Sequence, residues 1–427
     1  MDLPQFVSLL ALALVLARWA AELGLAWLNR RFVLAHAREV PAAFKDFIDP
    51  ATYDKSVRYT LAKSRFGQAE DAWDTAILLG VLFSGVLPAA FDRFVAWRGD
   101  SAWAMAAFLF LVGMALTLTG LPFHWYAQFR LEERFGFNTT TAKRWWTDWL
   151  KGLVLSLVLG YPLLVLILKL VDWTGAWWWL WAWGCVLGFE FLLHVLGPVL
   201  ILPLFNKFTP LPEGTLRDRL LALARRTNFR ARSIQVMDGS KRSRHSNAFF
   251  AGVGRFRKIV LFDTLIQQLT EPELEATLAH EIGHWSLRHI PKIVLWSAGS
   301  LLAGFYAVAW LAQRDWFYRA FGFGFTEGGI VPALLLFGLL SGTLAFWFSP
   351  LFYSRLRRYE YRADAFAAAT MGEPDSMIGA LRKLYEKNLS NLTPHPLYSG
   401  FYYSHPTLLE REAALVRRGE EDPRQND

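Results

Sequence analysis

Long apolar stretches dominate the pattern of hydrophobic and polar positions along the chain. Each is close to the ~20 residues that an α-helix needs to cross a hydrocarbon core about 30 Å thick. They fall at roughly 5–28, 73–92, 102–123, 151–171, 177–204, 292–313 and 330–353. The pattern therefore predicts an integral protein of the lipid bilayer, an all-α bundle of seven transmembrane helices.

The part of the chain between the fifth and sixth stretches has the pattern of a water-soluble α/β segment. Residues 216–227 are amphipathic at helical spacing, and 233–237 and 258–262 are short β-prone runs. We therefore expect four regions along the chain: 1–205 with five spans, 206–291 as a cytoplasmic α/β segment, 292–353 with two spans, and 354–427 as a cytoplasmic C-terminal segment.

Composition and charge agree with a membrane protein. Of the 427 residues 54% are hydrophobic and 16% aromatic, and the net charge is +8. Lysine and arginine concentrate in the odd-numbered connections, which the positive-inside rule places in the cytoplasm with the N-terminus outside. The charge thus indicates membrane orientation and not nucleic-acid binding.

Arg18 and Glu22 lie four apart inside the first stretch, where we expect them to pair.

Residues 270–285, T-E-P-E-L-E-A-T-L-A-H-E-I-G-H-W, carry recognisable metal chemistry. The T-x-x-E sequence that opens them is a capping box, which predicts a helix. On that helix His280 and His284 lie one turn apart on one face, where two imidazole nitrogens can hold one zinc ion. Glu281 then lies beside the metal, where its carboxylate can accept a proton from a metal-bound water.

A catalytic zinc with two histidines takes a third protein ligand. The sequence has one cysteine, Cys185, within an apolar stretch, and His289 would lie off the ligand face if the helix continued. Beyond the last span, Glu360 and Asp364 lie one turn apart. Glu360 could complete the site and Asp364 could orient a ligand histidine. A solvated acidic helix face would have the same spacing.

Two further groups of residues are candidates for the site. Metallopeptidases of this helix type hold an extended substrate along an edge strand, and 247–252, beginning Asn247-Ala248-Phe249, is the best candidate for that strand, although an ordinary hairpin has the same pattern. Glu190 and His194 lie one turn apart within an apolar stretch, where they could line a polar cavity or form an internal pair.

The chain resembles the type I CAAX prenyl proteases, seven-span zinc endopeptidases that cut prenylated C-terminal motifs. The resemblance rests on five boxes in register over nearly the whole chain: H-E-I-G-H-W at 280, R-R-Y-E-Y-R-A-D-A-F-A at 357, K-R-S-R-H-S-N-A-F-F-A-G at 241, the E-x-x-G-F-N turn at 133 and Y-S-H-P-T-L-L-E-R at 403.

The resemblance implies one Zn²⁺ per chain held by His280, His284 and Glu360, with Glu281 catalytic and Asp364 beside the ligands. It also implies that His405 stabilises the oxyanion and that the segment at Asn247 runs along a peptide or protein substrate. The helices would enclose a large polar chamber, and the zinc-metallopeptidase subdomain would comprise the fifth loop and the C-terminal tail. Arg411 is expected to anchor that tail by an ion pair.

The substrate and the source remain open at this level. The absence of a dilysine-like signal at the C-terminus and the Ala-, Leu-, Arg- and Trp-rich composition favour a bacterial inner-membrane protein. A quality-control protease for membrane proteins, without a prenyl requirement, is an alternative function. A site-2 type intramembrane protease and a non-enzymatic metal transporter are others. Charged residues flank H-E-x-x-H here, which disfavours the site-2 type.

Overall fold

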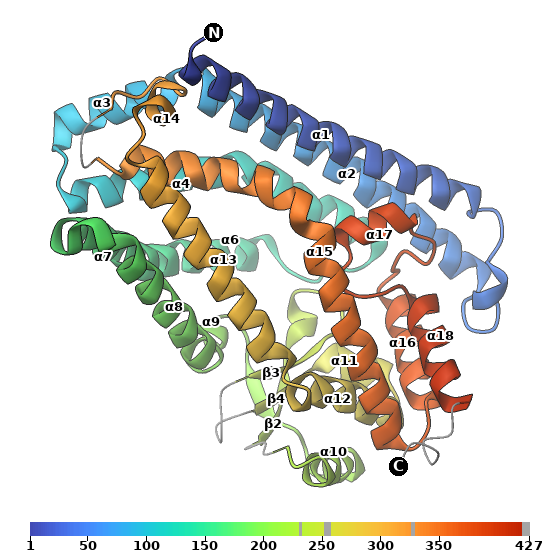
Figure 1. Cartoon of the computed structure of the whole chain (residues 1–427). Helices are drawn as coiled ribbons and strands as arrows, with labels where there is room; N and C mark the ends of the chain where they lie inside the picture. Colours follow the sequence, from blue (N-terminus) through green and yellow to red (C-terminus); the bar gives the residue numbers. More distant parts are fainter. Residues whose placement is uncertain (230–232, 252–257, 326–328, 421–427) are drawn as a thin grey trace.

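Helices make up most of the computed structural model, which describes residues 1–229, 233–251, 258–325 and 329–420 (Figure 1). Five helical runs in these ranges are long and apolar enough to cross a membrane. They are α1 (Leu3–Ala35), the run Ala102–Phe135, the run Ala142–Phe205, α13 (His289–Leu311) and α15 (Val331–Met371). The second run comprises α4 (Ala102–Tyr126), η2 (Ala127–Glu132) and α5 (Glu133–Phe135). The chain is thus a multi-pass membrane protein.

The stretch predicted as a single span at 73–92 is interrupted. Helix α2 (Pro50–Phe83) and helix α3 (Val86–Arg98) meet at a bend of 57° and together form a broken sixth candidate span. Gly85 has the left-handed φ of 75°, and the Ser84 hydroxyl accepts a hydrogen bond from the Val86 N–H. A single glycine can bend the helix in this way while the neighbouring residues stay apolar. The average hydropathy of the stretch therefore stays high and does not reveal the bend.

The run Ala142–Phe205 contains both of the stretches predicted at 151–171 and 177–204. It consists of α6 (Ala142–Leu155), η3 (Ser156–Gly160), α7 (Tyr161–Thr174), η4 (Gly175–Trp177), α8 (Trp178–Leu196), η5 (Gly197–Ile201) and α9 (Leu202–Phe205). The direction reverses near Gly175, which has φ 53°, and α7 and α8 pack side by side (Figure 1). Glycine permits this turn because it has no Cβ.

Two ionisable pairs lie within apolar helices. Arg18 Nε donates to Glu22 Oε1 at 2.8 Å, so the predicted pairing is confirmed. His194 Nδ1 lies 2.9 Å from the backbone carbonyl of Glu190, one turn earlier, and its ring is exposed on α8. His194 therefore bonds to the helix backbone, and no ion pair with the Glu190 side chain occurs in the described structure.

One four-stranded sheet lies at the end of the bundle, with strand order β1-β2-β4-β3. Strands β2 (Ser233–Met237) and β4 (Lys258–Phe262) match the predicted strands and pair in parallel. Strands β1 (Phe208–Pro210) and β3 (Ala248–Ala251) pair antiparallel to them. Helix α10 (Thr215–Arg226) matches the predicted amphipathic stretch within one residue at each end. Strand β3 is thus an edge strand.

Helix α12 (Glu271–Ser286) connects this sheet to the bundle. Its capping box is confirmed, since the Glu273 carboxylate accepts hydrogen bonds from the Thr270 N–H at 2.7 Å and hydroxyl at 2.8 Å. The stripe of Leu274, Leu278 and Ile282 is fully buried against the sheet and neighbouring helices. Helices α15 and α16 (Asp375–Lys387) pack on α12.

Helix α15 extends far beyond the apolar stretch predicted at 330–353. It contains Pro350 and bends part-way along (Figure 1), as expected where proline removes a helical hydrogen bond. Its last turns cross α12. The remaining short elements are η1 (Ala42–Phe44), η6 (Gly239–Lys241), α11 (Asp263–Gln268), α14 (Asp315–Arg319), α17 (Pro396–Tyr402) and α18 (Leu408–Glu420).

Candidate metal centre

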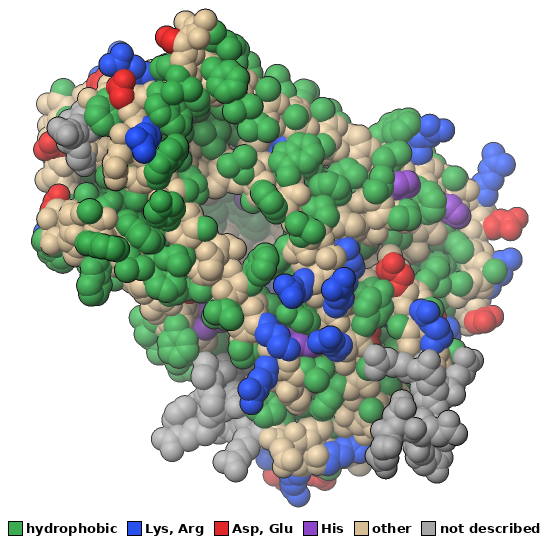
Figure 2. Space-filling view, in the orientation of Figure 1, with side chains coloured by type: hydrophobic (Ala, Val, Ile, Leu, Met, Phe, Trp, Pro, Cys, Tyr) green, Lys and Arg blue, Asp and Glu red, His purple; other side chains and the backbone are tan. Residues whose placement is uncertain are grey.

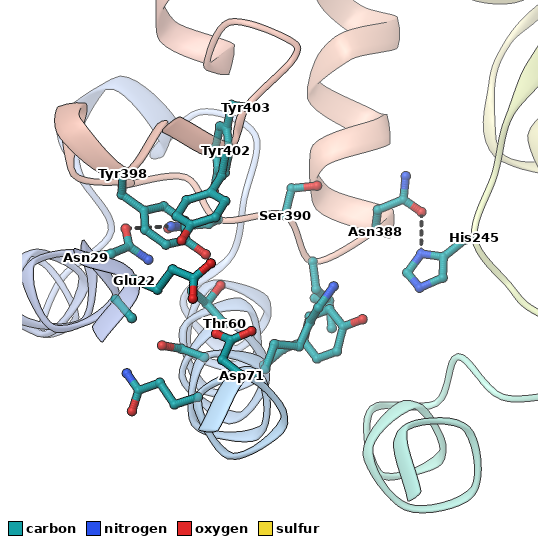
Figure 3. Close-up of a pocket in the computed structure, with 18 residues that line it drawn as sticks. Glu22, Asn29, Thr60, Asp71, His245, Asn388, Ser390, Tyr398, Tyr402 and Tyr403 are labelled. Atoms are coloured by element: carbon teal, nitrogen blue, oxygen red, sulfur yellow. Dashed lines mark hydrogen bonds between the residues drawn. The ribbon is translucent and has the colours of Figure 1, made fainter. Parts of the chain in front are cut away.

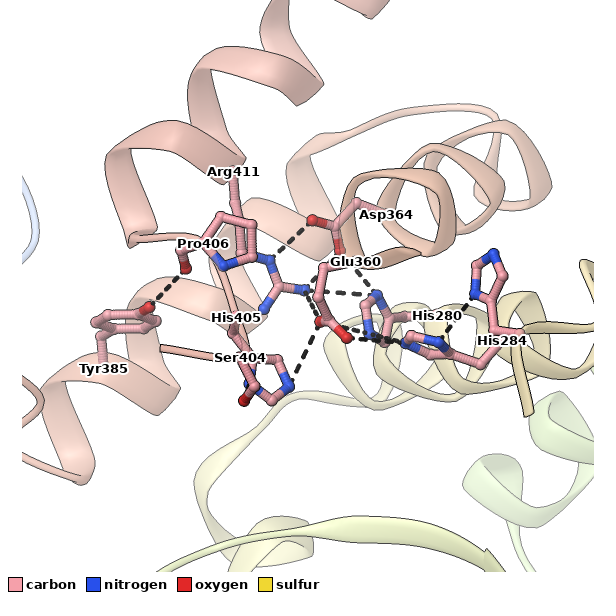
Figure 4. Close-up of polar contacts among 10 residues, drawn as sticks. His280, His284, Glu360, Asp364, Tyr385, Ser404, His405, Pro406 and Arg411 are labelled. Carbon is pink, nitrogen blue, oxygen red and sulfur yellow. Dashed lines mark hydrogen bonds and ion pairs between the residues drawn. The ribbon is translucent and has the colours of Figure 1, made fainter. Parts of the chain in front are cut away.

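His280, His284 and Glu360 converge on one point where α12 crosses α15 (Figure 4). His280 Nε2 and His284 Nε2 are 3.2 Å apart. Glu360 Oε2 is 3.5 Å from His280 Nε2, and Glu360 Oε1 is 3.2 Å from His284 Nε2. One ligand atom from each residue lies within 4.8 Å of the other two. The helical spacing that predicted this pair of histidines is confirmed.

The arrangement of these three side chains is better explained by a shared metal ion than by hydrogen bonds among them. Glu360 Oε2 is buried and accepts no hydrogen bond from the described residues, and the nitrogens of His280 and His405 lie 3.5 Å from it. A buried carboxylate oxygen without a hydrogen bond is costly. Two imidazole Nε2 atoms facing each other can share only one proton between them. A divalent cation would satisfy all three groups, and a His₂Glu set with an open fourth position is typical of catalytic zinc.

Asp364 and Arg411 hold His280 from behind. Asp364 Oδ1 is 2.8 Å from His280 Nδ1, and Arg411 donates to both carboxylate oxygens of Asp364, at 2.6 and 2.8 Å (Figure 4). Burial alone would lower the pKa of His280, but its hydrogen bond to the Asp364 carboxylate and its closeness to the Glu360 carboxylate raise that pKa to about 9. The Nδ1–H of His280 is thus fixed on Asp364, which directs Nε2 toward the metal position.

Replacing Asp364 by asparagine is expected to weaken metal binding by about tenfold to a hundredfold, because His280 loses the acceptor that sets its tautomer and orientation. The dissociation constant for Zn²⁺ can be measured by competition with a chromophoric chelator. The exposed Asp375, in the first turn of α16, supplies the control, since Asp375→Asn should leave the constant unchanged. Equal constants for all three proteins would contradict this role of Asp364.

His289 is a member of the site that the sequence did not reveal. The α12 helix ends at Ser286, and Arg288, with φ 54°, turns the chain into α13. His289 is consequently brought back against His284, with the two Nδ1 atoms 3.1 Å apart, and its ring stacks on Tyr359 at 4.3 Å. The assumption that the helix continues past 286 was wrong, although His289 lies behind the ligands and is not among them.

Glu281 and His405 both lie near the three metal-holding residues. Glu281 is on α12, and His405 is in the segment between α17 and α18. Burial is the main cause that raises the pKa of the Glu281 carboxyl, and the negative charge of Glu360 adds to it. A raised pKa suits a general base that must work near neutral pH. His405 Nε2 is 3.5 Å from Glu360 Oε2, while Ser404 Oγ is 2.9 Å from His405 Nδ1. The His405 side chain is 61% exposed, so a bound ligand could contact it.

Strand β3 lies beside α12 and presents its backbone at the sheet edge. Ala248 is buried and Phe249 packs on Phe262, so their side chains serve the core. Asn247 is exposed, and its side-chain oxygen accepts the Ala248 N–H at 2.8 Å. The edge position predicted for this segment is confirmed through Ala251, and Gly252 lies outside the described residues.

A polar cavity of about 530 Å³ lies between α1, α2 and the C-terminal region (Figure 3). Glu22 and Asp71 line it from the two helices, and Tyr398, Tyr402 and Tyr403 line it from α17 and the residue after it. His245, from the loop before β3, also reaches it and lies 3.1 Å from Asn388. Polar side chains from the spans and from the C-terminal region thus share one cavity.

Gly283, inside the H-E-x-x-H motif, sets how closely α12 and α15 approach. A Cβ placed there would lie 3.2 Å from the Ala363 Cα and carbonyl oxygen and 3.2 Å from the Phe366 Cβ. Gly283→Val should therefore force the two helices apart, lowering thermal stability and metal affinity together. Gly299→Val on α13, where an added Cβ meets open space, is the control for thermal unfolding. Unchanged unfolding of Gly283→Val would contradict this contact.

Two imidazoles and a carboxylate around one point, with the half-buried Glu281 on the same helix and an edge strand beside it, define the site as that of an H-E-x-x-H metallopeptidase embedded in a membrane protein. Comparison with known families is specific. Residues 29–207 match the model "CAAX prenyl protease N-terminal, five membrane helices", and residues 210–419 match peptidase family M48. The chain belongs to peptidase family M48 and, within it, to the CAAX prenyl protease 1 family.

Individual relatives are similar to this chain over nearly their full length. The chain is 36% identical to CAAX prenyl protease 1 of Saccharomyces cerevisiae, with 90% of each chain covered. It is 31% identical to the CAAX prenyl protease 1 homolog of Homo sapiens, with 94% of each covered. Its structure superposes on the crystal structure of S. mikatae Ste24p with a TM-score of 0.90 at 34% identity, covering 97% of this chain and 99% of that one. The chain is therefore a membrane metallopeptidase and not a metal transporter.

Proposed function

We propose that the protein is a zinc endopeptidase in which His280, His284 and Glu360 hold the metal. The observation that carries this proposal is the convergence of ligand atoms of these three residues within 4.8 Å of one another, with Glu281 next to His280 in the sequence. Zinc bound there would polarise the scissile carbonyl and acidify water. Glu281 accepts the proton of the attacking water and passes it to the leaving amine. His405 donates to the oxyanion that develops on the substrate.

The free edge of β3 is the proposed binding site for the backbone of an extended peptide substrate. A peptide lying antiparallel or parallel to the segment from Asn247 to Phe249 would bond to its backbone, which gives affinity with little side-chain selectivity. The packing of Ala248 and Phe249 into the core supports this reading, because a rigid strand keeps its backbone groups in register. The N–H and C=O groups of β3 then position the scissile bond over the metal centre.

We further propose seven spans around a polar chamber, with the metal centre on the cytoplasmic side and the N-terminus outside. The reversal at Gly175 would divide the run Ala142–Phe205 into two spans, and the α2–α3 pair would supply another. The 530 Å³ polar cavity and the hollow between α13 and α15 in Figure 2 support a chamber. The excess of lysine and arginine in the odd-numbered connections supports the orientation. A bacterial inner membrane is the proposed location.

The proposed substrates are peptides ending in an isoprenylated CAAX motif, as the names of the relatives state for those proteins. A quality-control role without a prenyl requirement is the second candidate, and the sequence-tolerant edge strand favours it. Purified protein should cleave a fluorogenic farnesylated CAAX peptide, and a chelator should stop cleavage until zinc is restored. Equal cleavage of the unprenylated peptide would favour the second function. Cleavage of neither peptide, or cleavage insensitive to chelator, would contradict the proposal.

A further inference from the structure

A basic cluster lies on the surface of the molecule between the start of α13 and the part of α15 just before Glu360. Figure 2 shows these blue side chains gathered below a broad apolar surface. Lys292 comes from the first turns of α13, and Arg355 and Arg358 come from α15. All three are exposed, and none lies within ion-pair distance of a carboxylate in the described structure. The cluster is thus an unneutralised positive surface.

The cluster forms one end of a groove between the two helices. Two adjoining cavities of about 310 and 540 Å³ share Lys292, Trp296, Arg355 and Tyr359. The Arg355 guanidinium lies 5.8 Å from the centre of the Trp296 ring, and Lys292 Nζ donates to the Leu287 carbonyl at 3.0 Å. These contacts hold the cationic groups at the groove mouth, with further donors of each group left over.

Away from the cluster the groove becomes apolar and shallow. Its floor along α13 continues through Gly299, Ser300 and Ala303, and a Cβ added at Gly299 would meet no atom within 4 Å. From Lys292 to Ala303 the helix rises about 16 Å, close to half of the ~30 Å hydrocarbon core. Leu295 and Leu351, beside the groove, are 75% and 69% exposed. A trough of small residues of this length can hold an acyl chain of one leaflet.

We propose that this groove binds an anionic phospholipid of the surrounding bilayer, with its phosphate on Lys292, Arg355 and Arg358 and an acyl chain along Gly299 and Ala303. Charge complementarity favours an anionic headgroup over a zwitterionic one, since each Lys or Arg near an anionic membrane surface adds attraction. Tryptophan is enriched at the boundary between headgroups and hydrocarbon, so Trp296 beside the basic cluster suits a groove that holds a headgroup at one end. The proposal depends on membrane embedding and not on the peptide substrate.

The groove lies close to the metal centre and is connected to it through two side chains. Tyr359 lines both cavities and stacks on His289, whose Nδ1 lies 3.1 Å from the Nδ1 of the ligand His284. A lipid seated on Tyr359 would restrict this ring from the outer side. The lipid would thus pack directly behind the residues that support one of the zinc ligands.

Native mass spectrometry of the full-length protein in detergent, titrated with phosphatidylglycerol or phosphatidylcholine, tests the proposal. The parent protein should bind phosphatidylglycerol preferentially and saturably. Lys292→Gln/Arg355→Gln/Arg358→Gln should weaken that binding by about a hundredfold, which corresponds to roughly 1 kcal/mol for each of the three cations. The control Arg93→Gln/Arg98→Gln/Arg314→Gln removes three exposed arginines elsewhere and should bind as the parent does. Equal loss in both triple variants, or in neither, would overturn the proposal.

Two further variants separate lipid from other occupants. Gly299→Leu keeps every charge but fills the trough, so it should also weaken phosphatidylglycerol binding. Lys292→Arg/Arg355→Lys/Arg358→Lys should preserve binding, because it keeps the three positive charges that attract an anionic headgroup. Displacement of the lipid by water-soluble glycerol phosphate at equal concentration would reveal a free-anion site and overturn the proposal. Displacement by a peptide with a free C-terminal carboxylate would assign the groove to substrate and overturn it equally.

Discussion

Replacement of Glu281 by glutamine should abolish peptide hydrolysis while leaving the metal bound. Glutamine has nearly the same size but cannot accept the proton of the attacking water, and loss of a positioned general base lowers the rate by about 10²–10⁴-fold. The three metal-holding side chains are untouched, so kcat should fall while zinc content by atomic absorption stays near one per chain. The measurement is kcat on the fluorogenic peptide together with the metal content of the same sample.

The matched control for this variant lies on the same helix. Glu271, in the first turn of α12, accepts a hydrogen bond from Thr215 and is far from the metal centre, so Glu271→Gln should retain kcat. Full activity of Glu281→Gln would remove Glu281 from the mechanism. Loss of zinc from Glu281→Gln would instead make Glu281 part of the metal-holding set.

Replacement of Glu360 by alanine should release the metal and, with it, the activity. Glu360 supplies the anionic ligand, so its loss should weaken zinc binding by more than the tenfold to hundredfold that loss of a supporting residue typically causes. Zinc content should fall, and added zinc should no longer raise the thermal unfolding temperature, because only a ligand bound by the native state stabilises it. Glu386→Ala, on α16, is the control, because the Glu386 carboxylate pairs with Lys387 and is not one of the metal-holding residues. Retention of zinc by Glu360→Ala would exclude Glu360 as a ligand.

Local patterns in the sequence predict the parts of the site that depend on one helix. The spacing of His280 and His284, the capping box at Thr270 and the strands at 233–237 and 258–262 are all read from periods of 3.6 or 2 residues, and all are confirmed. The pairing of Glu360 with these histidines depends on α15 crossing α12, about eighty residues away. Spacing alone favoured a solvated acidic helix face, and only the need for a third metal ligand and the family resemblance pointed to Glu360.

The contacts that the sequence missed are those made by turns or by distant packing. His289 reaches His284 because Arg288 adopts a left-handed conformation, which arginine rarely does. Arg411 was expected to anchor the tail by an ion pair, and it does so with Asp364. Its burial at 6% exposure and its place behind His280 follow from α18 docking on α15. No short-range period encodes either contact.

The docking of the tail has a consequence for the synthesis of the enzyme. Arg411, which holds Asp364, comes from α18, which follows both metal-holding helices in the chain. The backbone N–H of His395 donates to the Asn29 side chain on α1 at 3.0 Å, so the segment before α17 is seated against the first helix. A ribosome-bound chain would therefore insert its spans and fold α12 without a complete catalytic centre. Peptidase activity would begin only after α18 has been synthesised and has docked on α15.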